Sequence, residues 1–189
     1  LFGADQNAPV AVLRGGKALY IVPLRALAAE KYEDLKAFES LGIKVGISVG
    51  NYDSPDPTLE RFDVIVATSE RADSLLRHRM GWLQQLTVVV ADEVHLINDG
   101  DRGPTLEVTL AKLRQVNPKA QVLALSATIK NSDQLARWLE AEHVKSDWRP
   151  VPLKEGVYYD GLVYFTDDTT QEVRVEGDDL SGLVTDIIA

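Results

Sequence analysis

The sequence predicts an α/β domain built on a doubly wound parallel sheet, followed by a short appendage. The first observation is a series of five short apolar runs rich in β-branched residues, each bounded by polar or turn residues, as buried parallel strands are. The second is that amphipathic helical patterns lie between these runs. The third is that the alternation of strand and helix patterns stops after Glu142, where two prolines and a hairpin-like pattern follow.

Each element of the predicted domain has its own sequence signal. The predicted strands are, in order, Ala18 to Val22, Ile43 to Val49, Val64 to Ala67, Leu86 to Ala91 and Gln121 to Leu125. The predicted helices cover 24–39, 69–79, 104–116 and 132–141. Strands separated by helices of this length form right-handed βαβ crossovers, so their carboxyl ends share one edge of the sheet. Ligands of such folds bind at that edge.

The appendage is predicted to be a small β-structure followed by a helix. Gly156 to Phe165 and Gln171 to Val175 are expected to form a two-stranded hairpin around 166–170, and 180–188 is expected to start a helix. A segment this short cannot bury a core of its own without disulfides or metal, so we expect it to pack on something else.

Composition excludes several classes of protein. The chain of 189 residues is 45% hydrophobic and 26% charged, as ordinary globular domains are. It contains no cysteine, which excludes disulfides, thiolate-ligated metals and a cysteine nucleophile. Its apolar runs are far shorter than the roughly 20 residues that a membrane helix needs. We therefore expect no membrane association and a cytoplasmic location.

The net charge of −9 is concentrated near the C-terminus. Residues 151–189 contain only Lys154 and Arg174 as basic residues against nine acidic ones, whereas residues 1–150 are nearly balanced. Residues 1–150 can still present local basic groups to phosphates although their net charge is small. The overall charge therefore does not exclude nucleic acid as a partner.

The strongest chemical signal is the acidic pair that ends the fourth predicted strand, in Asp92-Glu93-Val94-His95. At the mouth of a parallel sheet the first carboxylate can hold Mg²⁺ beside a nucleoside triphosphate, and the second can activate a water. The alternative is a strand that simply ends in polar turn residues. A second strand ends in Ser126-Ala127-Thr128, whose hydroxyls either hydrogen-bond the acids or His95, or cap a helix.

Two further strand ends lead directly into predicted helices. Thr68-Ser69-Glu70 follows the third strand, with Thr68 or Ser69 as helix N-cap and Glu70 in the first turn. Pro23-Leu24-Arg25 follows the first strand, with proline near the helix start. Helix N-termini with free amide donors can anchor successive phosphates of a strand. Ordinary helix capping is the competing interpretation of both sites.

Other conspicuous polar residues are assigned no chemistry. The run Arg77-His78-Arg79 is expected to be a solvated helix end, with assistance to a nucleic-acid path as the alternative. The three histidines of the chain are scattered without ligand spacing, so zinc is not expected.

Together these motifs resemble motifs Ia, Ib, II and III of superfamily 2 helicases. The quoted residues stand in the same order and at similar spacing, and four ordered motifs are far more specific than one. The stretches 20–31, 46–53, 69–76 and 146–153 are most similar to the Ski-two-like branch, and within it to archaeal Hjm-type DNA repair helicases, relatives of the polymerase theta helicase domain. The resemblance covers roughly 14–188.

The resemblance implies the first RecA-like domain of an ATP-dependent 3′-to-5′ DNA helicase acting on forked or lagging-strand DNA in repair. Asp92 would coordinate Mg²⁺ and Glu93 would activate the hydrolytic water, while His95 with Ser126, Ala127 and Thr128 would couple hydrolysis to movement. The residues carried over as backbone contacts of single-stranded DNA are Pro23, Arg25, Thr68, Ser69 and Glu70. By this resemblance, residues 1–153 form the first domain and 154–189 the connector to a second RecA-like domain.

The sequence departs from the family in lacking a P-loop, the glycine-rich phosphate-binding motif. Gly16-Lys17 matches only the end of G-x-x-x-x-G-K-[ST], because Ala11 and Ala18 occupy the first-glycine and hydroxyl positions. The chain begins with Leu1 and contains no second RecA-like domain, so we expect a partial chain without ATPase activity of its own. An RNA helicase of the same branch and a non-catalytic binding lobe remain the alternatives.

Overall fold

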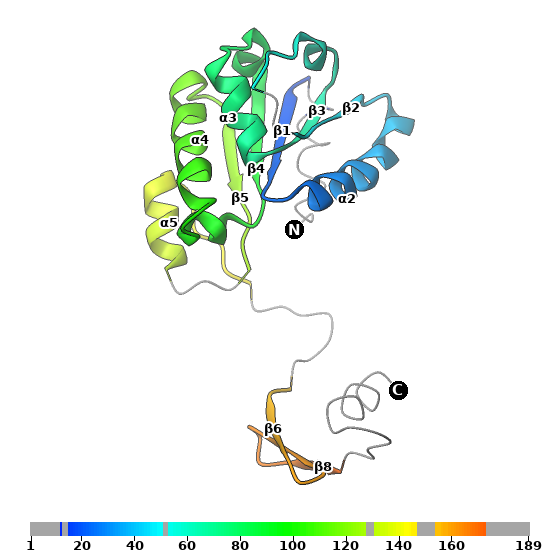
Figure 1. The fold of residues 1–189 in the computed structure, drawn as a ribbon, viewed down its shortest axis with the longest axis vertical. Coiled ribbons are helices and arrows are strands. Elements are labelled where there is room, and N and C mark those ends of the chain that lie inside the picture. Colours follow the sequence, from blue (N-terminus) through cyan, green and yellow to red (C-terminus); the bar gives the residue numbers. More distant parts are fainter. Residues whose placement is uncertain (1–11, 13–14, 51–52, 128–130, 147–153, 173–189) are drawn as a thin grey trace. The chain divides into compact units, whose positions relative to one another are not determined.

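The computed structural model describes residues 12, 15–50, 53–127, 131–146 and 154–172 (Figure 1). The chain forms two compact units, Leu1–His143 and Val144–Ala189. The first is a layered α/β unit and the second contains a small antiparallel sheet. In the large sheet the last three strands start at the predicted residues, the first starts one residue earlier than predicted, and the second starts two residues later.

Five parallel strands form the sheet of the first unit. They are β1 (Lys17–Val22), β2 (Val45–Ser48), β3 (Val64–Thr68), β4 (Leu86–Ala91) and β5 (Gln121–Ala124). Their order across the sheet is β2-β3-β1-β4-β5, and every neighbouring pair is parallel. The three central strands are almost wholly buried. This topology confirms the predicted doubly wound parallel sheet.

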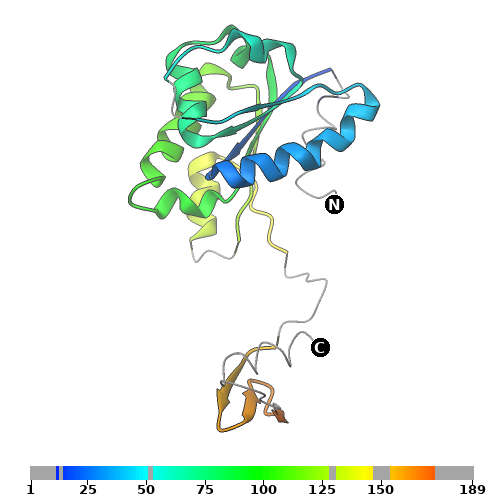
Figure 2. The ribbon, with the colours of Figure 1, turned by 45° about the vertical axis from the view of Figure 1, so that its right-hand side comes forward.

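Helices cover both faces of this sheet (Figures 1 and 2). One core layer packs alternate strand residues such as Tyr20 and Val90 against α2. The opposite layer packs Leu19, Ile21 and Val89 against the remaining helices. The helices are α2 (Arg25–Lys36), α3 (Ser69–Arg77), α4 (Gly103–Val116) and α5 (Ser132–Leu139). None of the helices in the described segments is long and apolar enough to cross a bilayer.

Short 3₁₀ helices connect several of these elements. They are η1 (Ala37–Leu41), η2 (Pro57–Arg61), η3 (Gly81–Gln85) and η4 (Val94–Asn98). The helix predicted over 24–39 is therefore α2 followed by η1. The 3₁₀ segment ends at Gly42, which takes a left-handed conformation at φ 84° and donates its N–H to the Glu39 carbonyl at 2.9 Å. Such i-to-i+3 bonds tighten a helix end.

The small sheet of the second unit corrects the predicted two-stranded hairpin. It has three antiparallel strands, β6 (Gly156–Tyr159), β7 (Leu162–Phe165) and β8 (Thr170–Glu172). The segment predicted as one strand is divided by Asp160 and Gly161, which both take positive φ. Asp-Gly at positive φ is the signature of a two-residue hairpin turn. The helix predicted over 180–188 lies outside the described residues.

Candidate functional site

The strand order divides the predicted site residues into two neighbouring groups at one edge of the sheet. β3 and β1 are adjacent, so their carboxyl ends bring Thr68-Ser69-Glu70 beside Pro23-Leu24-Arg25. β4 and β5 are also adjacent, which brings Asp92-Glu93 beside Ser126. Since β1 also pairs with β4, the two groups share a continuous edge.

Asp92 lies at the topological switch point of the sheet. The crossover that leaves β1 leads to β2, whereas the one that leaves β4 leads to β5 on the opposite side. Such a switch opens a crevice at the carboxyl ends of the two strands. The Asp92 N–H donates to the Ile21 carbonyl at 2.8 Å, which extends the β1–β4 pairing. The Asp92 carboxylate accepts from the Tyr20 hydroxyl at 3.0 Å and from the Glu93 N–H at 2.9 Å.

Glu93 has an unusual backbone conformation for its position. It is left-handed, with φ 51° and ψ 40°, and it immediately precedes η4. The other described non-glycine residues with positive φ follow or end a helix, or lie in turns of the small sheet: Arg79, Glu140, Asp160 and Asp168. A left-handed non-glycine residue costs about 1 kcal/mol or more, and such strain gathers at functional sites.

His95 lies beside the Glu93 carboxylate. Its Nδ1 is 3.1 Å from Glu93 Oε2, within ion-pair distance, yet this nitrogen has no aligned hydrogen-bond partner among the described residues. The two side chains are therefore close neighbours that are not joined by a hydrogen bond. The Glu93 side chain is 39% exposed and can also reach a ligand in solvent. The structure thus places His95 beside Glu93, and the roles assigned to the two residues stay predictions.

The end of β5 is held against the acidic segment through the main chain. Val94 donates its N–H to the Leu125 carbonyl at 2.8 Å, and Leu125 donates to Ala91 at 2.9 Å. Ser126 and Ala127 follow and are exposed. The Ser126 hydroxyl donates to the Ala127 carbonyl at 2.8 Å, so in this conformation it does not bond the acids. Thr128 lies outside the described residues.

At the β3 end, the predicted helix cap is confirmed. Thr68 is the N-cap of α3, and its hydroxyl accepts from the Arg71 N–H at 3.4 Å. Thr68 and Ser69 are each only 4% exposed, whereas Glu70 is exposed. A ligand at this position would therefore meet backbone groups and Glu70 before the two hydroxyls.

At the β1 end, Pro23 is buried and Arg25 is exposed. Arg25 is the first residue of α2, and Leu24 is its N-cap without a capping side chain. The helix start thus presents its amide donors together with one exposed guanidinium.

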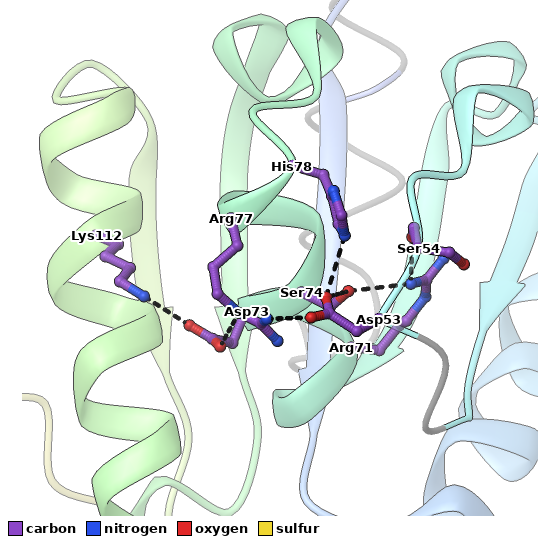
Figure 3. Close-up of polar contacts among 8 residues, drawn as sticks. All are labelled: Asp53, Ser54, Arg71, Asp73, Ser74, Arg77, His78 and Lys112. Atoms are coloured by element: carbon purple, nitrogen blue, oxygen red, sulfur yellow. Dashed lines mark hydrogen bonds and ion pairs between the residues drawn. The ribbon is translucent and has the colours of Figure 1, made fainter.

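Sequence reasoning assigned no role to Arg71, whose buried guanidinium organises the neighbouring loop (Figure 3). Its Nε donates to the Ser48 hydroxyl at 2.9 Å, and its Nη1 donates to the Ser54 carbonyl at 2.8 Å and to the Ser74 hydroxyl at 3.2 Å. Its Nη2 lies 3.8 Å from the Asp56 carboxylate. Ser74 lies one helical turn away, but Ser48, Ser54 and Asp56 are 15 or more residues distant in sequence, so no local pattern indicates these contacts.

Asp53 joins the same network from the loop side (Figure 3). It accepts from Ser74 at 3.0 Å, forms an ion pair with Arg77, and lies 3.1 Å from His78 Nε2. The hydrogen bonds from Arg77 and Ser74 hold the pKa of the Asp53 carboxyl below its ordinary value. Arg77 and His78 are exposed in part, as predicted, but the two side chains also hold this loop against α3.

Lys17, from the rejected P-loop match, has a structural role. It starts β1, and its ammonium donates to the Glu60 carbonyl at 2.9 Å and to the Phe62 carbonyl. Burial lowers the pKa of this ammonium, although Asp63 and Glu60 act in the opposite direction. Because Lys17 is 8% exposed and bonded to these carbonyls, it is not available to a phosphate.

The residues at the end of β4 fit a magnesium ion shared with a phosphate ligand. Asp92 and Glu93 offer hard carboxylate oxygens, and each carboxylate oxygen can accept more than one bond. In the described part of the chain, no group of three or more His, Asp or Glu residues could hold a metal alone. Magnesium bound by one or two carboxylates, water and nucleotide phosphates needs no such protein cage.

The chain belongs to the DEAD/DEAH box helicase family, whose model matches residues 7–135. Among its relatives, ATP-dependent DNA helicase Hel308 of Methanocella arvoryzae is 52% identical over 94% of this chain and 25% of its own length. Hel308 of Pyrobaculum calidifontis is 48% identical over 98% of this chain and 26% of its own length. Hel308 of Pyrococcus abyssi is 50% identical over 81% of this chain and 21% of its own length. The chain thus spans about a quarter of these relatives' length.

Proposed function

We propose that this chain is the first RecA-like domain of an ATP-dependent DNA helicase that tracks along single-stranded DNA in the 3′-to-5′ direction. The observation that carries the proposal is the Asp92–Glu93 pair at the switch point of the sheet, held between the ends of β1 and β5. Membership of the DEAD/DEAH box family and the names of the relatives support it.

In this proposal the residues at the ends of β4 and β5 act on the nucleotide, and the residues at the ends of β1 and β3 bind the DNA. Asp92 holds Mg²⁺, and Glu93 orients and deprotonates the attacking water. Bound magnesium neutralises charge on the nucleotide phosphates. His95, Ser126, Ala127 and Thr128 transmit the state of the nucleotide to a second RecA-like domain.

Pro23, Arg25, Thr68, Ser69 and Glu70 form the path of the DNA backbone. The exposed Arg25 contributes the positive charge, and the starts of α2 and α3 contribute amide donors. Backbone contacts of this kind tolerate any base sequence and weaken with salt. Forked or lagging-strand DNA is the proposed substrate, acted on in the cytoplasm during repair.

The domain division is also a proposal. We assign 1–153 to the first RecA-like domain and 154–189 to the connector. Since the 189 residues contain no G-x-x-x-x-G-K-[ST] motif, we expect no ATP hydrolysis by this chain alone.

The decisive experiment uses the product of the complete reading frame that encodes this chain. We expect Glu93→Gln to lower single-stranded-DNA-stimulated ATP hydrolysis by about 100-fold or more, because the attacking water loses its base. Nucleotide binding should be retained. Asp101→Asn removes an exposed carboxylate beyond η4 and serves as the matched control.

Equal hydrolysis by wild type and Glu93→Gln would contradict the assignment of Glu93. Absence of nucleotide binding and hydrolysis by the wild-type product would favour a non-catalytic binding lobe. Competition between single-stranded DNA and RNA of matched length tests which of the two nucleic acids the protein prefers to bind. Stronger binding of RNA would replace the DNA helicase proposal by an RNA helicase.

A further inference from the structure

Tyr20 places a phenol hydroxyl inside the core layer between the sheet and α2. It lies in the middle of β1, its side chain is fully buried, and its neighbours in this layer include Val22, Val88 and Val90. A phenylalanine would fill the same space in these apolar surroundings. Packing alone therefore does not account for the hydroxyl, since a buried hydroxyl needs a hydrogen-bond partner.

The register of the sheet explains which group satisfies this hydroxyl. Tyr20 is opposite Val90 in the β1–β4 pairing, and side chains two residues apart along a strand share one face. Asp92 follows Val90 by two residues and lies just past the end of β4. The Tyr20 hydroxyl reaches Asp92 Oδ2 at 3.0 Å across 72 positions of sequence.

The direction of this hydrogen bond follows from the chemistry of the two groups. An ionised carboxylate can only accept, so the phenol donates. The second oxygen, Oδ1, accepts from the Glu93 N–H at 2.9 Å. Both oxygens of Asp92 are therefore fixed, one by its own chain neighbour and one by a rigid aromatic side chain of the adjacent strand.

We propose that Tyr20 is a positioning residue that fixes the rotamer of the Asp92 carboxylate for magnesium–nucleotide binding. The inference rests on the proposed function, in which Asp92 holds Mg²⁺. Each carboxylate oxygen can accept more than one bond, so the two oxygens keep lone pairs for a ligand while their orientation is fixed. Partners that orient a metal-binding side chain in this way typically change metal affinity by about 10-fold or more.

The test compares Tyr20→Phe with wild type in the product of the complete reading frame. The quantity measured is the Mg²⁺ concentration that gives half-maximal binding of a fluorescent ATP analogue. We expect Tyr20→Phe to raise it by about 10-fold and to leave single-stranded DNA affinity unchanged. Tyr32→Phe, which removes a phenol hydroxyl from the half-buried Tyr32 of α2, is the matched control and should behave as wild type.

A Tyr20→Phe value within about twofold of wild type would overturn the inference and leave the proposed function standing. If Asp92→Asn also bound magnesium–nucleotide like wild type, the assignment of Asp92 itself would fail. Urea unfolding of the 189-residue chain gives an independent measurement through a double-mutant cycle of Tyr20→Phe and Asp92→Asn. We expect non-additive changes, and additive changes would overturn the inference.

Discussion

At the scale of single residues, the described structure gives the buried hydroxyl of Thr109 no hydrogen-bond partner. It lies on α4, its side chain is fully buried, and its Oγ1 has no hydrogen-bond partner among the described residues. An unpartnered buried hydroxyl costs about 1–3 kcal/mol relative to an apolar group of the same shape. We therefore expect Thr109→Val to increase the free energy of unfolding by about 1 kcal/mol, as measured by urea titration.

Thr105→Val on the same helix is the control for helix propensity, because both substitutions exchange one β-branched residue for another. Thr105 is only half-buried, so its hydroxyl can be hydrated. A smaller change is expected there. A decrease in stability of Thr109→Val would show that the hydroxyl has a partner that matters.

At the scale of elements, the contact between η4 and α4 depends on a residue without a side chain. Gly103 is the first residue of α4, and a Cβ atom there would lie 2.2 Å from the Ile97 carbonyl oxygen. This oxygen belongs to the backbone of η4, which carries His95. We expect Gly103→Ala to lower the free energy of unfolding by about 2 kcal/mol, because one of the two helices must shift.

Gly100→Ala is the matched control for this substitution. A Cβ atom at Gly100 would have nothing within 4 Å, and this glycine is exposed. Equilibrium urea unfolding of both variants separates the clash from the general effect of replacing glycine by alanine. Equal stability of the two variants would show that η4 and α4 adjust to the extra carbon.

The elements differ in how well the sequence predicted them. The strands of the large sheet were predicted closely because each is a short run of mostly apolar residues bounded by polar or turn residues. The first hairpin of the small sheet was missed even though Asp160-Gly161 carries a known turn signal. The apolar and aromatic residues on both sides of these two positions were instead taken together as one strand over 156–165.

At the scale of the whole molecule, contacts between distant segments were the part that the sequence could not predict. The acidic pair and the N-cap of α3 were predictable because each depends on adjacent residues. The bond from Tyr20 to Asp92 and the contacts of Arg71 depend instead on strand order and loop path. Only the assembled fold brings these groups together.

One such set of contacts joins α3, α4 and the loop before η2, and makes the stability of the fold depend on pH. Asp73 of α3 accepts from Lys112 of α4 at 2.8 Å and from Arg77 at 2.9 Å (Figure 3). Partial burial acts to raise the pKa of Asp73, but the bonds from Lys112 and Arg77 outweigh it, so this pKa lies below the ordinary value of an aspartate. The folded state therefore binds the proton less readily than the unfolded chain does.

The sign of the resulting pH dependence follows from linkage. A carboxyl with a lowered pKa in the folded state stabilises the fold fully above its unfolded pKa, and this contribution is lost as pH falls through the folded value. We expect the urea midpoint of wild type to fall as pH drops below about 4, and Asp73→Asn to show a shallower fall. The exposed Glu107→Gln on α4 is the control and should retain the wild-type slope. Parallel curves for wild type and Asp73→Asn would show that the network joining α3 to α4 contributes nothing to acid sensitivity.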